Sequence, residues 1–243
     1  MPFNPQIRQL QADLSCMGYT PGPLDGFWGP RTATAAWNLR LREGIENREV
    51  GPAFYVAVER LMIAERHTAA ELDASQMGVL FPLGEAAYLE PLNAAMWDGA
   101  LDRTRAISFL AQLGHESGGL RWFEEIASGE AYEGRADLGN TEPGDGKRYK
   151  GRGPIQLTGR ANYRRFGSLL GLDLENYPKS AATPEIGFRV AVMYWTDRNL
   201  NALADLGDFE GITRAINGGL NGLPHRRHWW TRVSTTIGEQ GSC

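Results

Sequence analysis

The chain has few of the residues that mark several large protein classes. Only two of its 243 residues are cysteines, Cys16 and Cys243. Two are too few for the disulfide framework of a small secreted domain. We expect a buried thiol at Cys16 and a free thiol at Cys243 rather than a disulfide between them. The cysteines and the four histidines also show no metal-ligand spacing, so we expect no metal and no cofactor.

Long hydrophobic runs and excess positive charge are also missing. No apolar run approaches the roughly 20 residues of a membrane span. The start of the chain, Met1-Pro2-Phe3-Asn4, lacks the basic and apolar regions of a signal peptide. We therefore expect a protein made in a cytoplasm, without membrane insertion. The 25 Lys and Arg against 29 Asp and Glu give a net charge of −4, which argues against nucleic acid as a partner.

The first 65 residues have the pattern of a small helical domain. Apolar residues recur at helical spacing from Ile7 to Met17, and a turn-rich stretch follows. Pro30 suits the first position of a second helix, because its missing N–H is not needed there. A third apolar stripe runs from Phe54 to Met62. The sequence predicts three short helices around one core.

The rest of the chain also favours helices. We expect a helical connector over residues 66–82 and an α-rich second domain over 83–243. Residues 188–195 are apolar almost all round, which is typical of a central helix. Residues 128–153 are rich in Gly, Asp, Glu and Arg without periodicity, and predict a long loop or a short hairpin region. The fold class is therefore mainly α.

Two glutamates carry the chemical interpretation. Glu116 ends an apolar helical stretch before Gly118-Gly119, and Glu125 follows nine positions later. Alone, Glu116 reads as an ordinary helix-end glutamate, and spacing does not choose between Glu125 and its neighbour Glu124. A polar loop over 150–158 adds hydroxyl and amide groups. Two carboxylates with such a loop are what hydrolysis of a polysaccharide requires.

The order of these motifs resembles glycoside hydrolase family 19, a chitinase-like family of the lysozyme superfamily that includes many phage endolysins. The resemblance covers residues from about 105 to 228 and implies an inverting mechanism. It makes Glu116 the general acid and Glu125, rather than Glu124, the general base, with Thr158 holding the attacking water. It also implies substrate-binding roles for His115, Gln156, Asn162, Tyr163, Asn217 and Arg226, although Arg227 is adjacent to the last of these.

The N-terminal segment resembles the peptidoglycan-binding domain of cell-wall hydrolases. The matching residues include Gly18-Tyr19, Leu24-Asp25-Gly26, Trp28-Gly29 and Thr32. The resemblance implies a wall-binding module in which Tyr19, Asp25, Trp28 and Thr32 take part. The alternative is that Asp25-Gly26 is only a turn and that Tyr19 and Trp28 are only core residues.

Together, the two resemblances predict a monomeric phage endolysin that cuts β-1,4 bonds in the glycan strands of peptidoglycan. Such an enzyme acts on the wall, in the periplasm, after holin-dependent release, and causes host lysis. A chitinase is the first alternative, and a non-catalytic wall-binding protein is the second. The host species and the identity of the cleaved bond, at muramic acid or at glucosamine, stay open.

Overall fold

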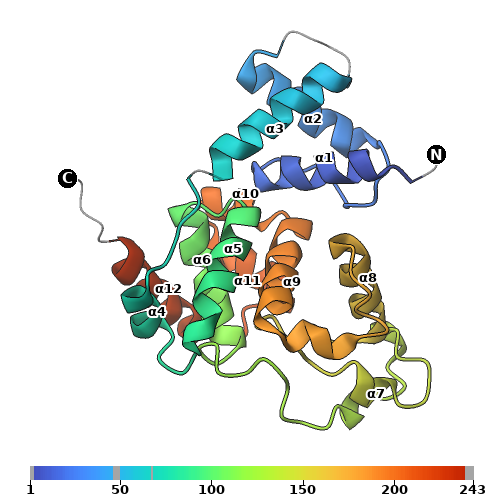
Figure 1. Ribbon diagram of the computed structural model, residues 1–243, viewed down its shortest axis with the longest axis vertical. Coiled ribbons are helices and arrows are strands. Elements are labelled where there is room, and N and C mark those ends of the chain that lie inside the picture. The colour runs from blue at the N-terminus through green and yellow to red at the C-terminus, as the bar shows by residue number, and fades with distance from the viewer. Residues whose placement is uncertain (1–2, 46–49, 67, 239–243) are drawn as a thin grey trace. The chain divides into compact units, whose positions relative to one another are not determined.

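The structure is a computed structural model that describes residues 3–45, 50–66 and 68–238. It confirms a mainly helical fold (Figure 1). Within the described ranges no strand forms, and pairing is limited to isolated bridges such as Glu124 with Arg152 and Arg152 with Leu157. None of the described helices has the length and apolar character needed to cross a membrane. Cys243 lies outside the described residues, whereas Cys16 is buried as expected.

The described chain divides into two compact units, and the division falls inside helices α5, α6 and α9. The first unit combines Met1–Ala70 with Met96–Ser108 and Trp195–Asn221. Its complete helices are α1 (Pro5–Cys16), α2 (Pro30–Glu43), α3 (Pro52–Arg66), α10 (Leu200–Asp205) and α11 (Phe209–Asn217).

Helices α1, α2 and α3 pack together at the N-terminal end of the chain (Figure 1). The Asn4 side chain caps α1, and α2 begins at Pro30, as predicted. Their apolar stripes meet in one core, as the sequence predicts. The buried residues of this core are Leu10, Leu14, Cys16, Met17, Ala35, Ala36, Leu39, Phe54, Val58, Met62 and Ala100.

This core is not confined to the first 65 residues. Ala100 belongs to it, and the buried Ser15 hydroxyl donates a hydrogen bond of 2.6 Å to the Thr196 carbonyl. Arg105 donates to the Cys16 carbonyl and forms an ion pair of 2.7 Å with Asp205. The N-terminal helices therefore share one compact unit with two later segments. The domain boundaries at 65 and 82 stay a prediction.

The second unit combines Glu71–Ala95, Phe109–Tyr194 and Gly222–Cys243. Its complete elements are α4 (Ala74–Leu80), η1 (Ala86–Tyr88), η2 (Glu130–Tyr132), η3 (Ala136–Leu138), α7 (Asp145–Arg148), α8 (Arg160–Leu170), η4 (Pro178–Ala182) and α12 (Leu223–Gly238). The divided helices are α5 (Leu89–Asp98), α6 (Arg103–Glu116) and α9 (Pro184–Asp197).

Two regions of this unit refine the sequence predictions. The connector predicted as helical over 66–82 is helical only in α4, which Asp73 caps through the backbone N–H of Gln76. Residues 128–153 form a long loop with short helical turns rather than a hairpin. Asp145 anchors this loop, because its buried carboxylate forms an ion pair of 2.5 Å with Arg160.

Candidate active site

Glu116 is the last residue of α6, and its side chain meets α12. Its Oε1 atom lies 2.6 Å from the guanidinium of Arg226, whose side chain is buried. Arg226 also donates a hydrogen bond to the buried amide oxygen of Gln112, one helical turn before Glu116. Since residues three and four apart share a helix face, Gln112, His115 and Glu116 present one surface to α12. Arg227, the alternative to Arg226, is exposed.

The residues of α12 that face α6 are also three or four positions apart. His225 Nδ1 lies 2.8 Å from His115 Nδ1, and Trp229 packs so closely that a Cβ on Gly114 would lie 2.4 Å from its ring. A Cβ on Gly222, just before α12, would lie 2.4 Å from the His115 ring. Burial and then the positive charge of Arg226 lower the pKa of His115.

The turn after Glu116 brings an aromatic ring beside the helix end. Gly118 and Gly119 both adopt positive φ, the left-handed region that stops a helix. The Ser117 hydroxyl donates to the Leu113 carbonyl and accepts from Leu120 N–H, which fixes the turn. The Trp122 ring lies over Gly118 and stays 39% exposed. The Arg121 guanidinium lies 4.4 Å from the centre of this ring, over one of its faces, so only the other face could contact a sugar.

Glu125 is held by neutral hydrogen-bond donors. Its Oε1 accepts from the Tyr132 hydroxyl at 3.0 Å, and its Oε2 accepts from the backbone N–H of Gly151 at 3.0 Å. Burial, followed by the hydrogen bond to Glu125, raises the pKa of Tyr132, so the phenol stays a donor. The Glu125 side chain is half-buried and makes no ion pair in the described part of the chain. The Lys150 ammonium donates to the backbone carbonyl of Glu125 at 2.9 Å, whereas the carboxylate itself is held by neutral donors.

Glu124 has a different environment. Its carboxylate pairs with Lys150 at 3.4 Å and with the buried Arg152 at 3.2 Å. The other two glutamates of this region are engaged in the loop. Glu130 pairs with Lys147 at 2.8 Å on the surface, and Glu133 accepts from the backbone N–H groups of the turn after residue 143.

The loop over 150–158 lies against Glu125. Gln156 adopts a positive φ of 54°, which non-glycine residues adopt rarely. Its amide donates to the carbonyl of Gly153. The Thr158 hydroxyl donates to the Gln156 carbonyl, and the Asn162 amide donates to the Thr158 carbonyl. Gln156, Thr158 and Asn162 thus form one hydrogen-bonded group.

Tyr163 supports this loop from inside the core. Its ring is fully buried, and its hydroxyl donates to the Lys150 carbonyl at 2.8 Å and accepts from Arg152 at 3.1 Å. Burial raises the pKa of Tyr163 to about 12. Full burial leaves no surface for direct contact with a sugar, in contrast to the substrate-binding role that the resemblance implies. The geometry gives Tyr163 a supporting position.

Asn217 belongs to the first unit, where it ends α11. Its amide donates to the Asn221 carbonyl at 3.0 Å, and its side-chain oxygen accepts from Gly219 N–H. It therefore orders the turn that contains Gly218-Gly219.

Asp25 and Thr32, both implied wall-binding residues, are held by internal hydrogen bonds. Gln11 donates to Asp25 and to Thr32, and Thr32 also donates to the Pro21 carbonyl. Tyr19 and Trp28 are partly buried against the core of the first unit. These contacts give all four residues structural roles in the helical module.

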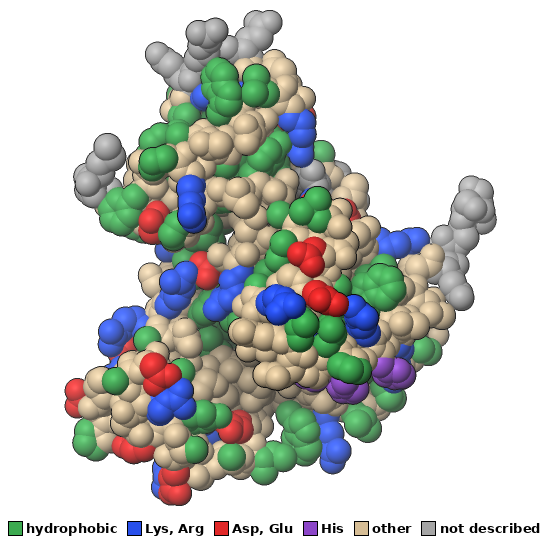
Figure 2. Space-filling model, turned by 180° about the vertical axis from the view of Figure 1, so that it is seen from behind, with side chains coloured by type: hydrophobic (Ala, Val, Ile, Leu, Met, Phe, Trp, Pro, Cys, Tyr) green, Lys and Arg blue, Asp and Glu red, His purple; other side chains and the backbone are tan. Residues whose placement is uncertain are grey.

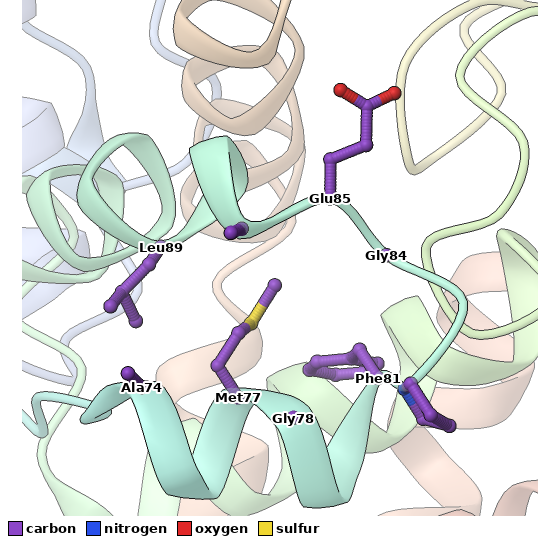
Figure 3. A pocket seen from close by; sticks show the side chains of 9 residues that line it. Ala74, Met77, Gly78, Phe81, Gly84, Glu85 and Leu89 are labelled. Carbon is purple, nitrogen blue, oxygen red and sulfur yellow. The ribbon is translucent and has the colours of Figure 1, made fainter.

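A cavity of about 160 Å³ lies beside α4, away from the two carboxylates. Met77, Phe81 and Leu89 line it, and Figure 3 shows the Glu85 carboxylate pointing away from Met77 and Phe81. Ligand sites are commonly about 300–1,000 Å³ with a few convergent polar groups. The cavity is smaller and more apolar than such sites, and neither Glu116 nor Glu125 lines it. Among the described residues, no cluster of three His, Cys, Asp or Glu is placed to hold a metal ion.

Four residues that the sequence did not assign to the site lie beside its predicted members. Gln112 contacts Arg226, His225 contacts His115, Tyr132 binds Glu125, and Trp122 lies against Gly118 in the turn after Glu116. Helical spacing from Glu116 was a signal for Gln112. No periodicity links Tyr132 to Glu125, because a loop connects them.

A family model described as chitinase class I, of glycosyl hydrolase family 19, matches residues 92–203. This range contains Glu116, Glu125 and Thr158. A *Haemophilus influenzae* protein described as a glycosyl hydrolase family 19 domain-containing protein is 34% identical over 180 residues, covering 60% of this chain and 88% of that protein. The *Arabidopsis thaliana* endochitinase At2g43610 is 38% identical over 126 residues, covering 51% of this chain and 43% of the plant protein.

Solved structures agree with these sequence matches. Chitinase C from *Streptomyces griseus* superposes with a TM-score of 0.59 and 25% identity, covering 68% of this chain and 92% of that one. A bacterial family 19 chitinase superposes with a TM-score of 0.56 and 26% identity, covering 70% of this chain and 97% of the other.

Proposed function

Because this chain belongs to glycoside hydrolase family 19, we propose that this chitinase-like enzyme cleaves β-1,4 bonds in the glycan strands of bacterial peptidoglycan. The observation that carries the choice of polymer is the N-terminal module. Its sequence resembles a peptidoglycan-binding domain, and α1, α2 and α3 form the three-helix core expected of one. A wall-binding module attached to a glycosidase directs it to peptidoglycan.

Glu116 is the proposed general acid. Arg226 holds its Oε1 atom, so in the protonated acid the other oxygen carries the proton and transfers it to the leaving glycosidic oxygen. As that proton moves, the bond between the anomeric carbon and the leaving oxygen breaks, and the ring gains oxocarbenium character. Trp122, in the turn that follows this acid, is partly exposed and is a candidate contact for a neighbouring sugar ring.

Glu125 is the proposed general base. A water molecule held by the Thr158 hydroxyl loses a proton to Glu125 while its oxygen attacks the anomeric carbon from the opposite side. The product has a new reducing end of inverted configuration. Such a reaction needs about 6.5–9.5 Å between the two carboxyl groups, which leaves room for the water. Glu124 is a weaker candidate, because Lys150 and Arg152 already neutralise it.

The proposal extends to an endolysin role. A phage-encoded enzyme of this kind acts as a monomer on the wall in the periplasm, after holin-dependent release from the host cytoplasm, and lyses the host. Purified sacculi incubated with the enzyme should release muropeptides with new reducing sugars, and mass spectrometry of the reducing-end sugar identifies the bond. Free amines without reducing ends would instead indicate an amidase or peptidase.

Glu116→Gln is the matched test of the acid. The variant keeps the size of the side chain but cannot donate the proton, so it should bind sacculi and release no reducing sugars. Lysis by the variant would remove Glu116 from the mechanism. Retained binding together with lost cleavage also excludes a purely wall-binding protein, since such a protein would show no cleavage in the wild type.

Chitin is the second candidate substrate, because relatives of this chain are described as endochitinases and the superposed structures as chitinases. Both polymers have a β-1,4-linked backbone with N-acetyl groups, so the two glutamates suit either one. Parallel assays on chitin oligosaccharides and on sacculi at equal sugar concentration discriminate between them. Turnover of chitin alone would overturn the peptidoglycan proposal and leave the family assignment unchanged.

A further inference from the structure

Two neighbouring pairs of residues join α6 to α12 beside the proposed acid. In the first pair, Glu116 binds Arg226 at 2.6 Å. In the second, His115 Nδ1 lies 2.8 Å from His225 Nδ1, with ring centroids 5.0 Å apart. His115 and Glu116 are consecutive in α6, and His225 and Arg226 are consecutive in α12. A shift of α12 at this point therefore moves Arg226, which holds Glu116.

We propose that His225 is a positioning residue of the active site, whose hydrogen bond to His115 keeps the Glu116–Arg226 pair in place and makes that placement depend on pH. The proposal rests on the proposed role of Glu116 as the acid. His225 does not touch the substrate; it acts through His115.

The chemistry of imidazole gives this contact its pH dependence. A hydrogen bond between two Nδ1 atoms needs a proton on one and a lone pair on the other. It forms with two neutral rings or with one charged ring, but not with two charged rings. Imidazole titrates near pH 6.5 and the pKa of His115 is lowered, mainly by burial, so the contact breaks only when acidification puts a charge on both rings.

The groups around the two rings oppose a charge on both rings at once. Burial is the main cause of the lowered pKa of His115; Arg226 and His225 also disfavour a charge on this ring, and Glu116 favours one. On α12, the His228 ring stacks against His225 at 6.5 Å and adds a third titratable group. Histidine side chains gather on one solvent-exposed face (Figure 2), so solvent protons reach them.

The backbone at Gly222 borders the His115 ring on one side. Gly222 has a φ of +71°, and a Cβ there would lie 2.8 Å from His115 Nε2. On the same face of α12, Trp229 packs edge-on to His225. The His115 ring thus lies between the backbone of Gly222 and one polar partner, His225. Loss of the hydrogen bond to His225 should therefore reorient the ring.

The test compares His225→Phe, His225→Asn and the control His228→Phe. Phenylalanine keeps the ring but removes the hydrogen bond. We expect kcat of His225→Phe to fall about fivefold at about pH 8, with KM unchanged. The difference from the wild type should vanish below about pH 5, where the wild type has also lost the bond. The assay uses sacculi or chitin oligosaccharides, whichever the wild type cleaves.

His225→Asn places an amide near the position of Nδ1 and does not titrate. It should keep most of the activity at neutral pH and lack the wild-type loss between about pH 7 and pH 5. His228→Phe should behave as the wild type. A constant ratio of His225→Phe to wild-type activity at all pH values would overturn the proposal. So would an identical effect of His228→Phe, or a folded His225→Asn as impaired as His225→Phe.

A second measurement separates this inference from the proposed function. Imidazole nitrogen shifts measured by NMR report the tautomer and the pKa of His115. In His225→Asn and His225→Phe the positive charge of His225 is gone, so the pKa of His115 should rise. An unchanged pKa of His115 in both variants would contradict the proposal that His225 acts on His115. If the wild type cleaves neither polymer, the proposed function fails, and the NMR titration still decides whether His225 controls His115.

Discussion

At the scale of single residues, the surroundings of two adjacent carboxylates separate their roles. Glu124 faces Lys150 and the buried Arg152, whereas Glu125 receives hydrogen bonds from Tyr132 and from a backbone N–H. A general base must accept a proton and then release it. A carboxylate already paired with two cations is less suited to that task than one held by neutral donors.

Glu125→Gln and Glu124→Gln should therefore differ sharply. Removing the base should lower kcat/KM about 10²- to 10⁴-fold, and an amide keeps the hydrogen bond to Tyr132. Glu124→Gln should keep most of the activity and lower the free energy of unfolding by about 1 kcal/mol, because Arg152 loses part of its ion pair. Reducing-sugar assays and urea unfolding measure the two effects.

The opposite pattern, with activity lost in Glu124→Gln and kept in Glu125→Gln, would assign the base to Glu124. Tyr132→Phe is a useful control for geometry. It removes only the donor to Glu125, so it should reduce kcat much less than Glu125→Gln does.

The sequence indicated both of these glutamates but left open which of them is the general base. The choice depends on groups that come from elsewhere in the chain, namely Gly151, Lys150 and Arg152. Their approach is set by an isolated bridge in a loop, and loops have no periodicity from which contacts can be inferred. Arg226 was distinguished from Arg227 in the same way, because only packing shows which of the two faces inward.

At the scale of elements, the contact between α6 and α12 positions the proposed acid. Gly114 gives α12 its close approach, since a Cβ there would lie 2.4 Å from the Trp229 ring. The sequence predicted that α6 is a helix from its apolar spacing. It could not predict α12 as the partner, because the approach depends on one glycine matched to one tryptophan far along the chain.

Gly114→Ala should lower the free energy of unfolding by about 1–3 kcal/mol, the usual result of overpacking. The midpoint of thermal unfolding should fall by roughly 2–4 °C for each kcal/mol in a chain of this size. Gly78→Ala is the matched control in α4, where a Cβ meets nothing within 4 Å. Alanine favours a helix over glycine by about 0.5–1 kcal/mol, so this variant should be slightly more stable. Equal destabilisation of both would contradict the close contact.

The loop over 128–153 depends on one buried ion pair. Arg160 holds the pKa of the Asp145 carboxyl below its usual range. A carboxyl with a lowered folded pKa stabilises the protein above its unfolded pKa and loses this effect as the pH falls. Asp145→Asn should therefore cost about 3 kcal/mol at neutral pH, and the difference from the wild type should shrink below about pH 4.

Urea unfolding of both proteins at several pH values tests this prediction. Asp137→Asn is the control, because Asp137 pairs with Arg135 on the exposed surface and such pairs contribute little. A difference between Asp145→Asn and the wild type that is independent of pH would show that the ion pair is not its cause.

At the scale of the whole molecule, the N-terminal helices and the later segments of the first unit share buried polar contacts. Asn201 donates to the carbonyls of Cys16 and Gly99, and Arg105 donates to the carbonyl of Cys16. The sequence predicted the three helices and their core correctly. It did not predict these contacts, because each joins residues about ninety or more positions apart and local patterns do not report such distances.

Deletion of residues 1–65 tests how far the N-terminal module is an independent domain. The deletion uncovers Ala100 and removes the Cys16 carbonyl from the buried side chains of Arg105 and Asn201. Each buried polar group left without its partner lowers the free energy of unfolding by about 1–3 kcal/mol. We therefore expect residues 66–243 alone to unfold at a clearly lower temperature than the full chain and to lose activity with stability. A truncated chain with unchanged stability, full turnover of soluble glycan and lost binding to sacculi would instead support an autonomous wall-binding domain that ends near residue 65.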